Sequence, residues 1–194
     1  IVSNWRELPA FDVYSTLVDT VGVLYPDAPP RINPAPYLKS DKQLASVWSK
    51  RLFGRSKGYR VGLVWRGNPE HFNDFRRSVD FELLVPLIMR NPSVAWLGLQ
   101  KDAGPRELPI INAGPQLESF EDTAAVIENL DLVISIDSAV AHLAGAMGKP
   151  VWTLLPYAAE WRWPRKGDDA YWYPSMRLFR QSHPGYWPDV IDHI

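Results

Sequence analysis

Short apolar runs alternate with helix-like segments along most of this chain beyond residue 40. The run at 60–65 is bounded by Gly58 and Gly67, and a short continuous apolar run of this kind is typical of a strand buried on both faces. Five further runs predict strands at 94–99, 108–111, 132–136, 151–155 and 176–179.

Helical spacing of apolar residues appears between these strands. A first helix is expected to begin at Ser40, which can cap it, and to end at Gly54. Further helices are predicted over 81–89, 122–130 and 138–147. Strands that alternate with helices in this way indicate βαβ units. The sequence therefore predicts an α/β fold, a Rossmann-like doubly wound parallel sheet.

The stretch before residue 37 has a different character. It carries a proline-rich run from Pro26 to Pro36, and proline at this density blocks both helix interiors and central strands. We expect residues 1–36 to form an irregular N-terminal extension and residues 37–194 to form the folded domain.

Composition narrows the class of protein. The 194 residues are 46% hydrophobic and 22% charged, with a net charge of −1 and no cysteine. This composition excludes disorder and disulfides, and it argues against a protein that coats nucleic acid. No apolar run approaches the roughly 20 residues that span a bilayer, so we expect a cytoplasmic protein. The four histidines lack metal-ligand spacing, so no metal site is expected.

The most informative polar residues follow the predicted strand 132–136. Asp137 and Ser138 come directly after it, and a helix of small residues begins at once. The first free N–H groups of such a helix suit a phosphate. His142 lies one turn after Ser138 on the same helix face. Alternatively, Asp137 or Ser138 is only a helix cap and His142 is a hydrogen-bonded core residue.

Two other strands are followed by candidate ligand-binding residues. The loop after 60–65 has glycine, asparagine and the arginine pair Arg76 and Arg77, which suits bidentate phosphate contacts. It lacks the glycine fingerprints of dinucleotide-binding and P-loop sites, and a solvated basic loop explains it equally well. Gln100 and Lys101 follow the strand at 94–99. The aromatic residues at 161–174 favour a structural role, with Trp161 and Trp163 near the crevice.

Taken in order, several segments resemble a known group of enzymes. They read RVGLVWRGNP at 60–69, LQK at 99–101, SIDSAVAHLAG at 135–145, WRW at 161–163 and WYPSMRLFRQ at 172–181. They resemble the carboxyl-terminal domain of bacterial tetratricopeptide-repeat glycosyltransferases, which are related to heptosyltransferases and O-linked N-acetylglucosamine transferases. The resemblance implies one half of a GT-B architecture, in which two Rossmann-like domains flank the active site. It also implies metal-independent, cofactor-free transfer from a nucleotide-sugar.

The resemblance implies donor contacts at eleven positions: Asp137, Ser138, Ala139, His142, Gln100, Lys101, Trp65, Gly67, Asn68, Arg76 and Arg77. It leaves the catalytic residue unknown, because the amino-terminal domain or the acceptor side usually supplies the base. Residues 1–36 would then be a remnant of that domain, and residues 37–194 the nucleotide-sugar-binding domain. Together with the start at Ile1, this predicts a fragment that is inactive alone, whose partners are the donor, an unknown acceptor and the missing domain. Exposed cleft surface would favour self-association.

Two other functions compete with this interpretation. The nine tryptophans and the missing base also fit a non-catalytic Rossmann-like module that binds a partner or a glycan. A dinucleotide-dependent oxidoreductase ranks third, because the glycine fingerprint is absent.

Overall fold

The computed structural model describes residues 10–24, 36–54, 58–101 and 108–194. The chain divides into two compact units, residues 1–31 and residues 32–194. The first unit contains helix α1 (Leu17–Leu24), which the expectation of an irregular extension missed. Neighbouring residues stabilise the start of this helix: the Thr16 hydroxyl accepts a hydrogen bond from Asp19 N–H and donates one to the Asp19 carboxylate. Most of the proline-rich run, residues 26–35, lies outside the described residues.

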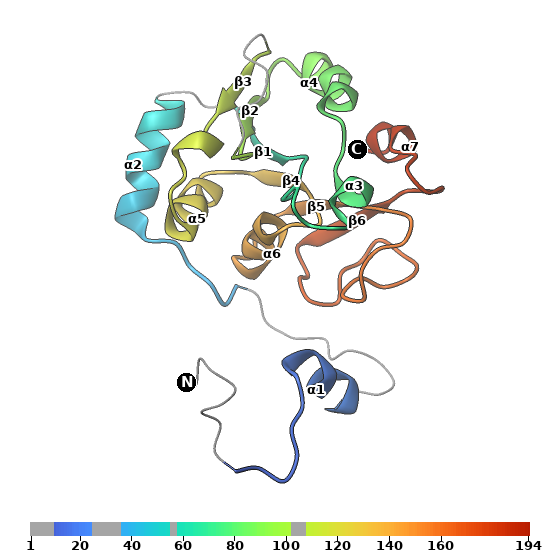
Figure 1. Ribbon diagram of the computed structural model, residues 1–194. Helices are drawn as coiled ribbons and strands as arrows, with labels where there is room; N and C mark the ends of the chain where they lie inside the picture. Colours follow the sequence, from blue (N-terminus) through green and yellow to red (C-terminus); the bar gives the residue numbers. More distant parts are fainter. Residues whose placement is uncertain (1–9, 25–35, 55–57, 102–107) are drawn as a thin grey trace. The chain divides into compact units, whose positions relative to one another are not determined.

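The second unit is built on a six-stranded sheet with the strand order β3-β2-β1-β4-β5-β6 (Figure 1). Every neighbouring pair is parallel. This confirms the predicted α/β, Rossmann-like fold, and all six predicted strands are present. They are β1 (Arg60–Val64), β2 (Ala95–Gly98), β3 (Ile110–Asn112), β4 (Leu132–Ile136), β5 (Val151–Leu155) and β6 (Met176–Arg180).

Helices cover both faces of the sheet, as Figure 1 shows. On one face lie α2 (Lys42–Phe53), α5 (Phe120–Glu128) and α6 (Ala139–Ala146), and on the other lie α4 (Val85–Arg90) and α7 (Pro188–Asp192). Side chains join α2 to α5: Trp48 Nε1 donates to Asp122 Oδ1 at 3.1 Å. Because all the strands are parallel, their carboxyl ends lie along the same edge of the sheet. Ligands bind at this edge in sheets of this kind.

The helices differ from the sequence prediction at several points, among them the start of α5, which is Phe120 rather than Asp122. Asp41, not Ser40, caps α2, because its carboxylate accepts from Leu44 N–H. The predicted helix 81–89 begins as a 3₁₀ turn, η2 (Phe81–Leu84), and becomes α-helical only at α4, with proline in its first turn. Two short elements were not predicted, α3 (Asp74–Arg77) and η3 (Gly114–Gln116).

Residues 36–38, the first described residues of the second unit, are bonded to the end of α6. The backbone N–H groups of Tyr37 and Leu38 both donate to Ala146 O, at 2.9 and 3.1 Å. Pro36 lies against Gly148, whose φ of 72° ends the helix. Among the described residues, no helix is both long and apolar enough to cross a membrane.

Candidate functional site

A cavity of about 630 Å³ opens at the carboxyl edge of the sheet. Its walls are the segments that follow three adjacent strands, β1, β4 and β5. The lining residues are His71, Phe72, Asn73, Arg76, Arg77, Asp137, Ser138, Ala139, His142, Pro156, Ala158, Ala159, Glu160 and Arg162. Residues from different parts of the chain therefore meet where the fold places a ligand.

The floor of the cavity is the turn between β4 and α6. Ser138 is the N-cap residue in an extended conformation, yet its side chain does not cap the helix. Its hydroxyl instead lies 2.9 Å from that of the buried Ser135. The Ser138 side chain therefore does not occupy the first N–H groups of α6, and the helix dipole adds a positive partial charge at the same place.

A bonded network fixes the loop after β1. Asp74 is buried, and its two carboxylate oxygens accept from Arg77 Nε at 3.0 Å and from the Ser78 hydroxyl at 2.7 Å. That hydroxyl also accepts from Gly67 N–H. Arg77 Nη1 then donates to the backbone oxygen of Asp137 at 3.0 Å. Arg77 thus joins the loop after β1 to the turn after β4.

Asp137 is the acidic group on the cavity floor. Burial acts to raise the pKa of its carboxyl, but His142, Trp163 and the positive charge of Arg77 outweigh burial, so the pKa is lowered. His142 Nε2 lies 3.6 Å from Asp137 Oδ1. The buried Trp163 Nε1 makes no hydrogen bond of ordinary geometry within the described structure, so its influence on Asp137 is that of a nearby dipole. Asp137 is therefore an ionised acceptor at neutral pH.

Asp137→Asn should change how stability depends on pH. A lowered folded-state pKa means that Asp137 contributes stability above its unfolded value of 3.8, and that this contribution is lost as pH falls through the lower folded value. We expect the variant to be less stable than the parent at pH 7 and the difference to shrink below pH 3.8. Urea unfolding at several pH values measures this, with Asp192→Asn, at an exposed site, as control. A difference that is constant with pH would contradict it.

Cationic side chains lie in the two walls of the cavity that follow β1 and β5. Arg76 is exposed on the β1 side, with its guanidinium 5.4 Å from the Phe75 ring. Arg162, on the β5 side, forms an ion pair with Glu160 and lies over the Trp161 ring. The cavity thus offers arginines and helix N–H groups to an anion, and two carboxylates to hydroxyl groups.

The structure brings six of the eleven predicted contacts to this cavity: Asp137, Ser138, Ala139, His142, Arg76 and Arg77. The other five lie outside its lining. Trp65 is buried against Phe81, and the buried Gln100 uses its side-chain oxygen to accept from Arg66 N–H. Gly67 belongs to the Asp74 network, Asn68 Oδ1 accepts from Glu70 N–H, and Lys101 is exposed. Their role as donor contacts stays a prediction.

Sequence reasoning did not select the wall after β5. Residues 156–162 directly follow a predicted strand, so the rule that ligands bind beyond the carboxyl ends of strands was the available signal. Of the two tryptophans expected near the crevice, Trp163 stacks on His142 and Trp161 is half exposed. Neither is among the residues that line the cavity.

The strand order defines a Rossmann-like fold, with a polar cavity at a helix N-terminus. Residues 106–185 match glycosyltransferase family 9 (heptosyltransferase). That region includes β4, α6, Asp137 and His142, but not the loop after β1. The whole chain is 26% identical, over 205 aligned positions, to Protein FlbA of Caulobacter vibrioides (strain ATCC 19089 / CIP 103742 / CB 15). The chain spans 33% of the length of that protein. No solved structure matches the chain.

Proposed function

We propose that this chain is the donor-binding domain of a metal-independent GT-B glycosyltransferase and that its cavity takes a nucleotide-sugar. The observation that carries the proposal is the cavity itself, which the start of α6, at Ser138 and Ala139, lines together with Arg76 and Arg162. The match of residues 106–185 to glycosyltransferase family 9 supports the same chemistry.

The groups in the cavity have complementary tasks in this proposal. The helix N-terminus and Arg76 bind the diphosphate and stabilise the negative charge that grows on it as the sugar leaves. Asp137, held as a carboxylate by its surroundings, accepts hydrogen bonds from sugar hydroxyls. In line with the resemblance, the proposal assigns the catalytic base to the amino-terminal domain or to the acceptor side; a cytoplasmic location remains a part of the proposal that is still to be tested.

Isothermal titration calorimetry with UDP-, ADP-, GDP- and CMP-linked sugars tests the proposal. We expect at least one of them to bind the chain with millimolar or better affinity. Arg76→Gln should weaken that binding about tenfold, because it removes a charge-assisted contact without touching a buried bond.

Arg165→Gln is the matched control. Arg165 is exposed and lies outside the cavity lining, so its replacement removes the same charge and should leave affinity within about twofold. The proposal is lost if no nucleotide-sugar binds, or if Asp137→Ala leaves the binding unchanged.

One observation favours a second function, a non-catalytic binding module. Phe72, which lines the cavity, and Phe75, three positions further on, are 80% and 75% exposed, so two large apolar side chains of this loop are open to contact. In this alternative the face binds a partner protein or a glycan, and no sugar is transferred. Glycosyl transfer by the parent protein, lost on replacing His142, would rule the alternative out.

A further inference from the structure

The imidazole of His142 is enclosed by two aromatic side chains of the β5–β6 loop. Trp163 stacks on its face, with 5.2 Å between ring centroids and 16° between ring planes. Tyr173 stands edge-on to it, and its hydroxyl oxygen lies 3.1 Å from His142 Nδ1. On the other side of the ring, Nε2 lies 3.6 Å from Asp137 Oδ1. Each ring nitrogen therefore has one fixed polar neighbour.

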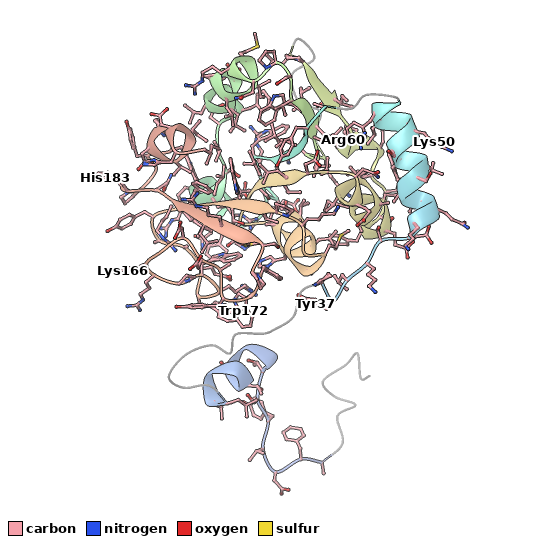
Figure 2. All side chains as sticks on the ribbon, turned by 180° about the vertical axis from the view of Figure 1, so that it is seen from behind. Tyr37, Lys50, Arg60, Lys166, Trp172 and His183 are labelled. Atoms are coloured by element: carbon pink, nitrogen blue, oxygen red, sulfur yellow. The ribbon has the colours of Figure 1, made fainter. Side chains whose placement is uncertain are left out.

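The position of the Tyr173 hydroxyl is fixed by packing. The side chain is 7% exposed, and its ring lies against Gly145 of α6 so closely that a Cβ on Gly145 would come within 2.5 Å of ring carbon Cγ. At its outer end the hydroxyl meets the side chain of Tyr37, which Figure 2 shows beside the loop that carries Trp172. The ring can neither slide along the helix nor swing away from His142 without a large rearrangement.

Both polar neighbours can be satisfied at once by the tautomer of His142 that carries its proton on Nε2. Burial first, and then the neighbouring Tyr37, raise the pKa of Tyr173, so its hydroxyl stays protonated and can donate to Nδ1. Asp137 is a carboxylate and can only accept, which requires a proton on Nε2. An Nδ1–H tautomer could still donate to the Tyr173 oxygen, but it would turn a lone pair of Nε2 toward the carboxylate and lose the interaction with Asp137.

We propose that Tyr173 is a positioning residue of the cavity: its hydroxyl holds His142 in the tautomer that carries the proton on Nε2, directed toward Asp137 and the cavity. Trp163 keeps the ring plane fixed, and Gly145 is the small residue that lets the Tyr173 ring reach this place. The consequence for ligand binding rests on the proposed function: a phosphate or sugar oxygen that enters meets an N–H group rather than a lone pair.

Tyr173→Phe isolates the hydroxyl, because it keeps the ring that packs on Gly145. The readout is the pair of ¹⁵N shifts of the His142 ring, recorded by NMR on the full 194-residue chain between pH 6 and 9 and assigned with His142→Gln. We expect the parent chain to give the pattern of a proton on Nε2 and Tyr173→Phe to give averaged shifts from mixed tautomers. Tyr171→Phe, which removes a more exposed hydroxyl from the same loop, should keep the parental pattern.

Affinity for ADP, GDP and UDP gives a second readout on the same variants. For any of these nucleotides that binds, Tyr173→Phe should weaken the binding by about three- to tenfold. This is the net effect of losing one hydrogen bond when hydrogen bonds to water are taken into account. Tyr171→Phe should change the affinity less than twofold. If Tyr173→Phe does not fold, Gly145→Ala provides the same spectral test, because the added methyl group displaces the Tyr173 ring and its hydroxyl.

The outcomes separate this inference from the proposed function. A proton on Nδ1 in the parent chain, or identical His142 spectra in the parent and in Tyr173→Phe, overturns the positioning role, whatever the nucleotides do. If the spectra change as expected while the UDP-, ADP-, GDP- and CMP-linked sugars all fail to bind, the positioning role stands and the proposed function falls.

Discussion

Replacing Gly114 with alanine is expected to lower the free energy of unfolding by about 3 kcal/mol or more, or to prevent folding. A Cβ at this position would lie 1.8 Å from the backbone oxygen of Gln100 and 2.3 Å from its carbonyl carbon. These are backbone atoms at the end of β2, so no side-chain rotation relieves the overlap. The segment from Ala113 is also held there, because Ala113 N–H donates to Gly98 O.

Urea unfolding followed by circular dichroism measures this loss. Gly22→Ala is the matched control: it adds the same methyl group inside α1, where nothing lies within 4 Å, and an alanine there should be neutral or slightly stabilising. An unchanged unfolding midpoint for Gly114→Ala would show that the loop can move away from β2, contrary to this account.

The second large effect is expected for Arg77→Gln, which should cost about 2–3 kcal/mol of stability. The change leaves the buried Asp74 carboxylate without its cation and removes the bond to Asp137 O. Both consequences act at the cavity, because the loop after β1 is then no longer joined to the turn after β4. Nucleotide-sugar binding should fall together with stability.

Arg76→Gln makes the same substitution one residue earlier. Arg76 is exposed and contacts the Phe75 ring, so its loss should change stability by less than about 0.5 kcal/mol while still weakening anion binding. Thermal unfolding and calorimetry on the two variants separate the roles of the neighbours. Equal destabilisation by both would refute the assignment of Arg77 as the joint between the loops.

The sheet could be predicted because its strands are buried on both faces and read as continuous apolar runs. Helix α1 could not be recognised so easily, since it depends on the local Thr16–Asp19 cap and is followed at once by prolines. The same holds for α3, a single turn stabilised by the Asp74 network.

In the candidate site, too, the positions of some residues could be predicted from the sequence and those of others could not. The turn around Asp137 follows from the chain pattern alone, because a strand end and a helix start fix where its side chains go. The orientation of the Gln100 side chain does not follow from the chain pattern. It depends on a hydrogen bond from Arg66 N–H, a residue 34 positions away at the end of the neighbouring strand. Contact of Tyr173 with His142 likewise depends on the path of the long β5–β6 loop.

The bonds of residues 36–38 to α6 bear on how this domain is isolated. A shortened gene that starts at the capped helix α2 looks natural from the helix pattern, yet it deletes both N–H donors to Ala146 O and the Tyr37 neighbour of Tyr173. Because α6 is only eight residues, about 12 Å, long, its far end lies at the cavity floor. A shortened protein made to crystallise or assay the domain by itself should therefore begin no later than Pro36.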